Sequence, residues 1–166
     1  MPDGGSLRQI PRGLRGLGEK MAASRPGSWY IMNVSARIDP VLLKATDGRL
    51  SSMPGVPILL LRHTGARTGE SRETPLVYLE DGNDLVLIAS KGGAPSHPQW
   101  YRNLVAHPEC EVIARGRSGR YRAREATGAR RDRLWEQAVD LYGGYAVYQQ
   151  RAGGRRVPVI VLSPME

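Results

Sequence analysis

The sequence contains very little cysteine and histidine. Cys110 is the single cysteine, which excludes an intrachain disulfide and a cysteine-rich metal site. It lies in an alternating apolar run, as expected for a small buried side chain. The 3 histidines, His63, His97 and His107, do not have the spacing of metal ligands. We therefore expect no metal site.

Long hydrophobic runs are also lacking. The longest, 58–61, is far too short to span a bilayer, and the N-terminus has no apolar segment typical of a secretory signal. We expect a soluble, cytoplasmic protein, and a chain of 166 residues is long enough for one domain with a core.

Several motifs of common enzyme classes are missing. No Gly-x-Gly-x-x-Gly follows a predicted strand, and the turn at 65–69 lacks the Gly-Lys-Ser/Thr end of a Walker loop. Ser90 has neither a Gly-x-Ser-x-Gly context nor a Ser-x-x-Lys spacing, and no pair of carboxylates stands out. Binding groups remain, without a proton-transfer dyad. An enzyme of this kind needs a cofactor that supplies the reactivity.

Positive charge, in contrast, is abundant. The chain has 24 lysines and arginines against 16 acidic residues, a net charge of +8. Such a surplus suits nucleic acid, anionic lipid or an acidic small molecule. The basic residues are nearly all arginine, and the codon bias of a GC-rich genome would also explain arginine in place of lysine. Arg120, Arg122 and Arg124 alternate with apolar residues, which a solvated strand face explains. A nucleic-acid-binding protein is one alternative.

The N-terminal third is predicted to be helical. Apolar residues between 7 and 21 recur at spacings of three and four, opposite a basic face. This helix could pack on the domain, cover a site or rest on a membrane. A short helix is expected from Asp39, as N-cap, to Ala45, with Asp47-Gly48 ending it. We interpret 1–56 as a helical extension of a domain at 57–166.

The domain itself is predicted to be mainly β. Strands are expected at 58–63, 72–79, 84–89, 111–114, 120–125 and 157–162. Helices are expected at 98–106, from an N-cap at Thr127 to Tyr142, and at 145–151. Successive hairpins, an inserted helix and a closing strand indicate an antiparallel sheet curled into a small barrel.

The stretch 88–104 is the most informative part of the chain. A strand ends in the Gly92-Gly93 turn, and a helix follows, with Ser96 as its expected N-cap. Such a turn leaves backbone N–H groups unpaired beside Ser90 and Lys91, which suits an anion or an electron-rich ring edge. An ordinary strand–loop–helix connection explains the pattern equally well.

Aromatic and basic residues nearby could complete a binding site. An aromatic ligand could lie against Trp100 and Tyr101, and the guanidinium groups of Arg67 and Arg72 suit carboxylates or phosphates. Tyrosines also recur every three residues, at Tyr142, Tyr145 and Tyr148. On a helix they would lie along one side, either packed in a core or as a rim of hydroxyl groups around a flat substrate.

Three sets of motifs, in order along residues 57–164, resemble the deazaflavin-dependent nitroreductases and quinone reductases of actinobacteria. The first is Thr64-Gly65-x-x-Thr68-Gly69-x-x-Arg72-x-x-Pro75-Leu76, followed by Asp81-Gly82. The second is Ala89-Ser90-Lys91-Gly92-Gly93-Ala94-Pro95 with His97-Pro98-x-Trp100-Tyr101-x-Asn103-Leu104. The third is Leu141-Tyr142-x-x-Tyr145-x-x-Tyr148 with Pro158 and the final strand.

The resemblance implies a split β-barrel, as in FMN-binding proteins, that binds coenzyme F420, an 8-hydroxy-5-deazaflavin with a phospholactyl-oligoglutamate tail. It implies hydride transfer from the reduced cofactor to a quinone, a conjugated enone or a nitroaromatic. Residues at the tail and phosphate would be Arg67, Thr68 and Arg72, and those at the ring Thr74, Pro75, Leu76 and Val77. The rest of the cofactor site would be Ile88, Ala89, Ser90, Lys91, Gly92, Gln99, Trp100, Tyr101 and Asn103. The catalytic residues facing the substrate would be Tyr142, Tyr145 and Tyr148, with Ser90 near the reacting end.

Two positions depart from the pattern of the family. Ala66 stands where many relatives carry a second basic residue, and Val77 stands where the nitroimidazole-activating branch has an aromatic. We therefore do not expect a nitroimidazole activator in particular. FMN or haem in the same barrel is the alternative cofactor. The chain could be a monomer or a homodimer, and contact with the inner face of the membrane through residues 7–21 is a further expectation.

Overall fold

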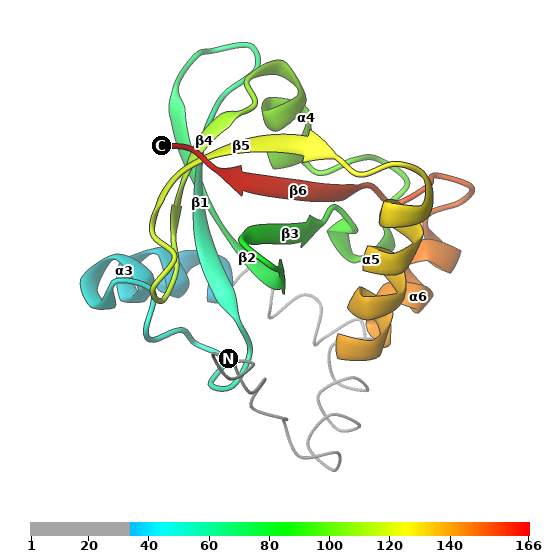
Figure 1. The fold of residues 1–166 in the computed structure, drawn as a ribbon, viewed down its shortest axis with the longest axis horizontal. Helices are drawn as coiled ribbons and strands as arrows, with labels where there is room; N and C mark the ends of the chain where they lie inside the picture. The colour runs from blue at the N-terminus through cyan, green and yellow to red at the C-terminus, as the bar shows by residue number, and fades with distance from the viewer. Residues whose placement is uncertain (1–33) are drawn as a thin grey trace, which may run out of the picture.

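The computed structural model describes residues 34–166, and the helix predicted at 7–21 lies outside them. Six strands form one closed barrel in the order β1-β2-β3-β6-β5-β4, with every neighbouring pair antiparallel (Figure 1). The strands are β1 Ile58–Thr64, β2 Ser71–Asp81, β3 Asp84–Ile88, β4 Glu109–Ile113, β5 Gly119–Glu125 and β6 Val159–Pro164. The predicted fold class, a small barrel of hairpins with a closing strand, is confirmed.

Strand β1 is buried on both of its faces. Leu59 and Leu61 belong to the core inside the barrel, whereas Ile58 and Leu60 pack outward against Leu43. Leu43 comes from helix α3, Ala36–Thr46, which covers this side of the barrel. The double burial explains why the strand is a continuous apolar run without alternation.

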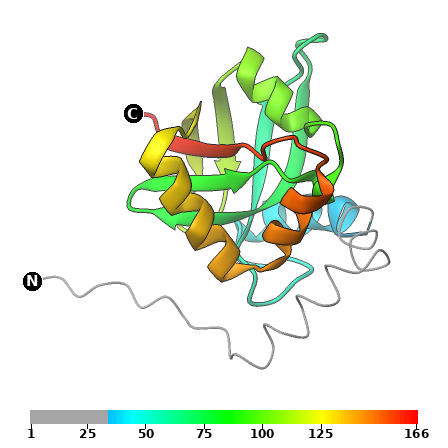
Figure 2. The ribbon, with the colours of Figure 1, turned by 90° about the vertical axis from the view of Figure 1, so that its right-hand side faces the viewer.

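The other helices lie at one end and on one side of the barrel. Helix α4, Gln99–Ala106, lies at the end where β1 and β2 meet, at the top of Figure 1. Helices α5, Gly128–Leu141, and α6, Gly144–Arg151, cover the outer face of β3 and β6 (Figure 2). A short turn of 3-10 helix, η2, Lys91–Gly93, connects β3 toward α4 and packs on α6.

Two predicted N-cap residues are wrong. Helix α3 begins at Ala36, so Asp39 lies inside it, 1% exposed, and its carboxylate accepts hydrogen bonds from the amide and hydroxyl of Ser52. Pro98, not Ser96, is the residue that precedes α4, and Ser96 instead accepts a hydrogen bond from Lys91. Both polar side chains have a partner elsewhere in the chain that competes with capping.

Other predicted boundaries hold. Asp47 and Gly48 are left-handed, and the N–H of Gly48 donates to a carbonyl of α3, which ends the helix as expected. Thr127 occupies the N-cap position of α5. Helix α5 is expected to reach Tyr142 but ends at Leu141, and Tyr142 is extended. Tyr145 and Tyr148 lie in α6, so the three tyrosines do not share one helix. Within 34–166, none of the helices combines the length and the apolar character that crossing a bilayer requires.

Candidate functional site

Strand β2 is longer than its partner β3, and the difference opens the sheet. Residues 71–77 of β2 pair with β1, but only Tyr78 to Asp81 pair with β3. Beyond the pair of Tyr78 with Leu87, the other edge of β2 has no strand beside it among the described residues. We call this region the β2–β3 split: 71–77 form one side of it and 88–92 the other.

The register of β2 shows which backbone groups face the split. The N–H of Tyr78 donates to the carbonyl of Pro57 at 3.1 Å, so the backbone N–H and C=O of Tyr78 point toward β1. Because the direction of these backbone groups alternates along an antiparallel strand, those of Val77 and Pro75 point the other way. Pro75 lacks an N–H and is tolerated at such an edge. The split therefore presents the N–H and C=O of Val77 and the C=O of Pro75.

Unpaired N–H groups lie on the other side of the split. Lys91, Gly92 and Gly93 are left-handed, with φ of 49°, 61° and 82°. The N–H groups of Gly93 and Ala94 donate to carbonyls within the turn, but those of Lys91 and Gly92 have no acceptor among the described residues. The turn thus offers the kind of N–H pair that the sequence predicts here.

A chain of hydrogen bonds joins α4, β1 and β2. The side-chain oxygen of Asn103 accepts from the N–H of Ala66 and from Gln99 Nε2, both at 3.0 Å. Asn103 Nδ2 must then donate to His63 Nδ1, also at 3.0 Å. His63 therefore carries its proton on Nε2 and donates it to Thr74 Oγ1 at 3.0 Å. The hydroxyl hydrogen of Thr74 is left to donate to another group.

His63 is neutral in this chain of bonds. Burial, and next the charge of Arg72, lower its pKa to about 4. Sequence reasoning did not assign it to the site, since it continues an apolar strand. The strand pattern could have indicated its role, because His63 continues the alternate positions of Leu59 and Leu61, which point into the barrel.

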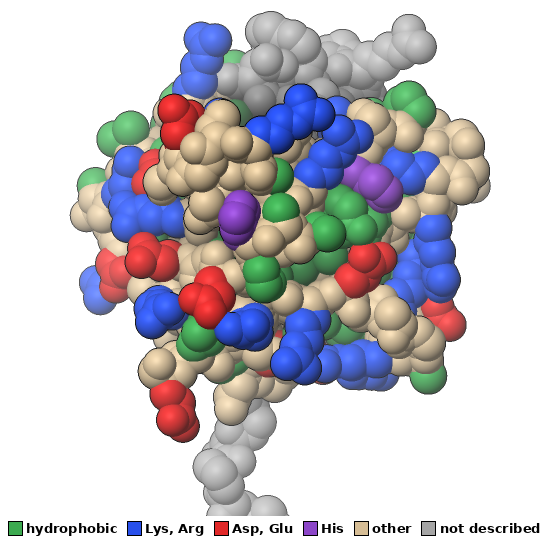
Figure 3. Space-filling view, turned by 90° about the horizontal axis from the view of Figure 1, so that it is seen from above, with side chains coloured by type: hydrophobic (Ala, Val, Ile, Leu, Met, Phe, Trp, Pro, Cys, Tyr) green, Lys and Arg blue, Asp and Glu red, His purple; other side chains and the backbone are tan. Residues whose placement is uncertain are grey.

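The turn between β1 and β2 carries the predicted tail-binding residues. Arg67 is exposed in this turn, and Arg72, also exposed, lies 3.5 Å from a carboxylate oxygen of Glu70. A side chain at Gly65 would meet Thr68 Oγ1 at 2.6 Å, so a larger residue there would displace the hydroxyl of Thr68. Figure 3 looks onto this end of the barrel, where basic side chains surround a group of hydrophobic ones. No contact of the described residues joins these arginines to Lys91, so their convergence remains a prediction.

The three tyrosines form one cluster. Their ring centroids are 5.2, 6.0 and 6.3 Å apart, and the hydroxyls of Tyr142 and Tyr148 are 3.0 Å apart. Tyr145 is 6% exposed and belongs to the same core cluster as Ile88 at the end of β3, so the tyrosines are part of a core. Burial raises the pKa of Tyr145, which keeps its hydroxyl protonated.

The two aromatic residues of α4 already have structural roles. Trp100 is buried in the core of the barrel. The hydroxyl of Tyr101 donates to Glu125 at 2.8 Å, and burial, with this bond, raises its pKa to about 12. Contact of these rings with a ligand remains a prediction.

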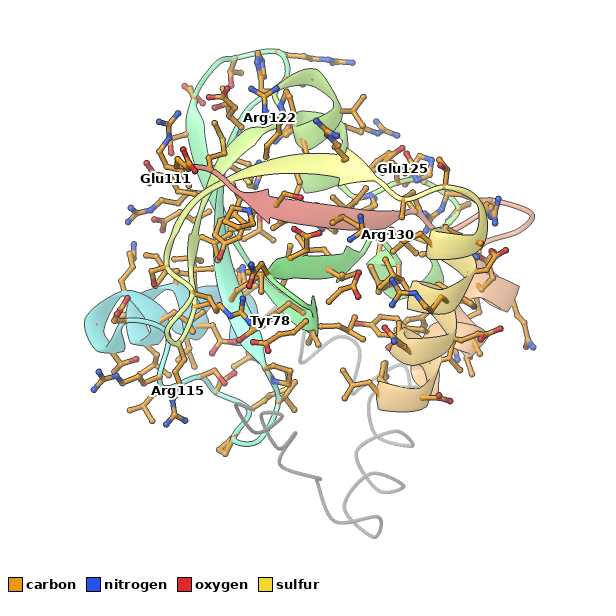
Figure 4. All side chains as sticks on the ribbon, viewed as in Figure 1. Tyr78, Glu111, Arg115, Arg122, Glu125 and Arg130 are labelled. Carbon is orange, nitrogen blue, oxygen red and sulfur yellow. The ribbon has the colours of Figure 1, made fainter. Side chains whose placement is uncertain are left out.

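The arginine row of β5 is partly neutralised within the sheet. Both Arg120 and Arg122 donate to the carboxylate of Glu109, at 3.2 and 2.7 Å. Arg122 and Glu125 lie along the same strand in Figure 4. One carboxylate therefore offsets part of the positive charge of the arginine row.

Known proteins are similar to this chain in sequence and in fold. The pattern of the F420H(2)-dependent quinone reductase family matches residues 34–164. An F420H(2)-dependent quinone reductase of Mycobacterium tuberculosis (strain H37Rv) is 36% identical over 132 residues, which cover 76% of this chain and 88% of that protein. A solved structure of an F420-H2 dependent reductase, FDR-A, is 38% identical with a TM-score of 0.59, and the match covers 64% of this chain and 94% of that one.

A second solved structure, described as a domain-swapped dimer, is 34% identical. Its TM-score is 0.62, and the match covers 83% of this chain and 99% of the other. These matches agree with the resemblance that the motifs carry. The chain belongs to the F420H(2)-dependent quinone reductase family.

Proposed function

We propose that this chain is an F420H2-dependent reductase that passes hydride from the reduced deazaflavin to a quinone, a conjugated enone or a nitroaromatic. The observation that carries the proposal is the β2–β3 split: within residues 34–166, one edge of 71–77 has no strand beside it, and the N–H groups of Lys91 and Gly92 in the turn after β3 have no acceptor. A flat heterocycle with polar atoms on its edge fits such a place. When bound, F420 supplies the hydride.

The free edge and the turn would hold the deazaflavin ring. The backbone of Val77 can donate to and accept from the ring edge, and Pro75 offers a second carbonyl. Thr74, whose hydroxyl is fixed as a donor by His63, and Leu76 would complete this side. The opposite side would be formed by Ile88, Ala89, Ser90, Lys91 and Gly92, with Gln99, Trp100, Tyr101 and Asn103 from α4.

The exposed cations of the β1–β2 turn would bind the acidic tail. Arg67 and Arg72 offer guanidinium groups, and Thr68 offers a hydroxyl, to phosphate and carboxylate oxygens. A charge-assisted hydrogen bond contributes about 1.5 to 3 kcal/mol. Arg72→Ala should therefore weaken F420 binding by roughly 10- to 100-fold.

A matched control for Arg72 lies at the opposite end of the barrel. Arg115 is exposed in the turn between β4 and β5, far from α4 in Figure 4. Arg115→Ala removes the same charge and should leave the dissociation constant of F420 unchanged. An equal loss of F420 affinity in the two variants would show that only net charge matters, and it would contradict this tail site.

The tyrosine cluster would face the hydride acceptor. Tyr145 is protonated and shares a core cluster with Ile88 of β3, so its hydroxyl can donate to an acceptor oxygen that gains negative charge. Tyr142, Tyr148 and Ser90 would complete the surface around the reacting end. Tyr145→Phe should lower kcat by roughly a hundredfold with little change in F420 affinity. Tyr121→Phe is the control, since that hydroxyl donates to the backbone carbonyl of Arg117 in the β4–β5 turn.

Assembly and location are further parts of the proposal. We propose that the protein is a homodimer, because a relative 34% identical to this chain is described as a domain-swapped dimer. We also propose that it is cytoplasmic. Light scattering tests the homodimer: a measured mass of one chain would contradict it.

The basic amphipathic pattern at 7–21 supports contact with the inner face of the membrane. Deleting residues 1–24 should abolish co-sedimentation with anionic vesicles, and unchanged sedimentation would refute this contact.

A further inference from the structure

A single arginine holds the backbone of the turn that borders the split. Arg155 lies between α6 and β6, and its guanidinium donates to the carbonyls of Ala89, Ser90 and Ala94 at 2.8 to 3.1 Å. It also donates to His97 Nδ1 at 3.1 Å. These contacts use all N–H groups of one guanidinium, and every acceptor lies within 89–97.

The environment of Arg155 differs from that of an ordinary ion pair. No carboxylate of the described residues lies within ion-pair distance of it, although its guanidinium is half-buried. The adjacent Arg156 is 70% exposed and pairs with Asp132 at 3.2 Å. The positive charge of Arg155 is therefore stabilised by carbonyl dipoles, whose orientation it fixes in return.

The orientation of these carbonyls determines what the turn presents on its other side. With the carbonyls of Ala89 and Ser90 directed to Arg155, the chain passes through the left-handed Lys91 and Gly92. A left-handed lysine is strained and persists only where surrounding contacts impose it. The N–H groups of Lys91 and Gly92 are the ones without acceptors among the described residues.

Helix α6 fixes Arg155 in turn. Gln149 of α6 donates to the carbonyl of Arg155 at 2.8 Å and accepts from the N–H of Val157 at 2.8 Å. The turn also packs directly on this helix, since a side chain at Gly93 would lie 2.8 Å from the carbonyl of Tyr148. Arg155 thus connects the tyrosine-bearing helix to the turn.

We propose that Arg155 is a positioning residue: it holds 89–97 in the shape that binds the deazaflavin and couples that turn to α6. The proposal rests on the proposed function for its ligand. Its physical core, a turn whose conformation depends on one guanidinium, is independent of the ligand.

The test uses three variants of the full chain. Arg155→Ala should raise the dissociation constant of F420 by about tenfold or more, because several charge-assisted hydrogen bonds are lost. Arg155→Lys keeps the charge but not the planar set of donors, and should restore little of the affinity. Guanidinium ion, well below denaturing concentration, should partly restore binding to Arg155→Ala. Arg156→Ala, the matched control, should bind like the wild type.

Amide hydrogen exchange supplies the readout that does not need the cofactor. Without F420, amides within 89–97 should exchange faster in Arg155→Ala and in Arg155→Lys than in Arg156→Ala, with the β1–β2 amides unchanged. Uniformly faster exchange in both variants would mean a general loss of stability and would overturn the positioning role. If Arg155→Ala has the amide exchange rates of the wild type in 89–97 and also binds F420 with wild-type affinity, the positioning role is overturned as well. If the wild type fails to bind F420, the proposed function fails, and the exchange of 89–97 still decides the role of Arg155.

Discussion

Replacing Asn103 with leucine would break the hydrogen-bond chain at its centre. Asn103 is 0% exposed and holds Ala66, Gln99 and His63 together. Leucine has the same branching and the same number of side-chain heavy atoms, so Asn103→Leu leaves no cavity but provides no polar atoms. The N–H of Ala66 and the Nδ1 of His63 then lose their partner.

The cost follows from those two stranded groups. Each buried polar atom left without a partner costs about 1 to 3 kcal/mol, so we expect a loss of roughly 3 to 4 kcal/mol. For a chain of this size that lowers Tm by roughly 10 °C. Calorimetry of Asn103→Leu beside Arg102→Leu, an exposed neighbour on α4, measures the difference. A Tm for Asn103→Leu equal to that of Arg102→Leu would refute the assigned network.

A second variant tests the assigned proton positions. Asn103→Asp keeps an acceptor for the N–H of Ala66 but gives His63 a carboxylate to face. The pKa of His63 should then rise above its unfolded value of about 6.5, so the variant gains stability below that pH and loses it as pH rises. The wild type should show the opposite trend, and equal pH profiles would contradict the assignment.

Three further predictions follow. In the wild type the pKa of His63 is about 4 in the folded state and 6.5 in the unfolded state. Its contribution to stability is therefore complete above pH 6.5 and is lost as pH falls toward 4. Tm measured at pH 7 and pH 5 tests this, and in His63→Gln this fall in Tm should be absent. Gly93→Ala should cost roughly 1 to 3 kcal/mol by urea unfolding, because φ is 82° and Tyr148 is in contact, whereas Gly69→Ala, in open space, should cost less. Asp81→Asn should weaken the attachment of α5 and cost about 1 kcal/mol in thermal unfolding, because hydrogen bonds from two arginines of α5 lower the pKa of that carboxylate.

Local patterns predicted most of the barrel. The β2–β3 hairpin follows from the Asp81-Gly82 turn between two extended apolar runs, and the sequence therefore located it correctly. Ends were less accurate: the strand predicted at 72–79 runs from Ser71 to Asp81, because its pairing with β1 and β3 continues beyond the apolar residues. The motifs of 64–76 and 88–104 also identified the family.

Residues whose partners are distant in sequence could not be predicted. His63 bonds to Asn103, 40 positions away, and Arg155 bonds to Ser90, 65 positions away. Asp39 resembles an N-cap locally, but Ser52 returns to it from the following loop. In each case the role of the polar side chain depends on a partner that only the folded chain brings close, and not on neighbouring residues.

The most direct test of the central claim is a fluorescence titration of the purified protein with oxidised F420, with FMN titrated in parallel. We expect saturable binding of F420 at roughly micromolar concentration or below, and no comparable binding of FMN. Tight FMN binding without an F420 response would contradict the cofactor while leaving the barrel unchanged. Binding of neither would contradict the proposal that the β2–β3 split is a deazaflavin site.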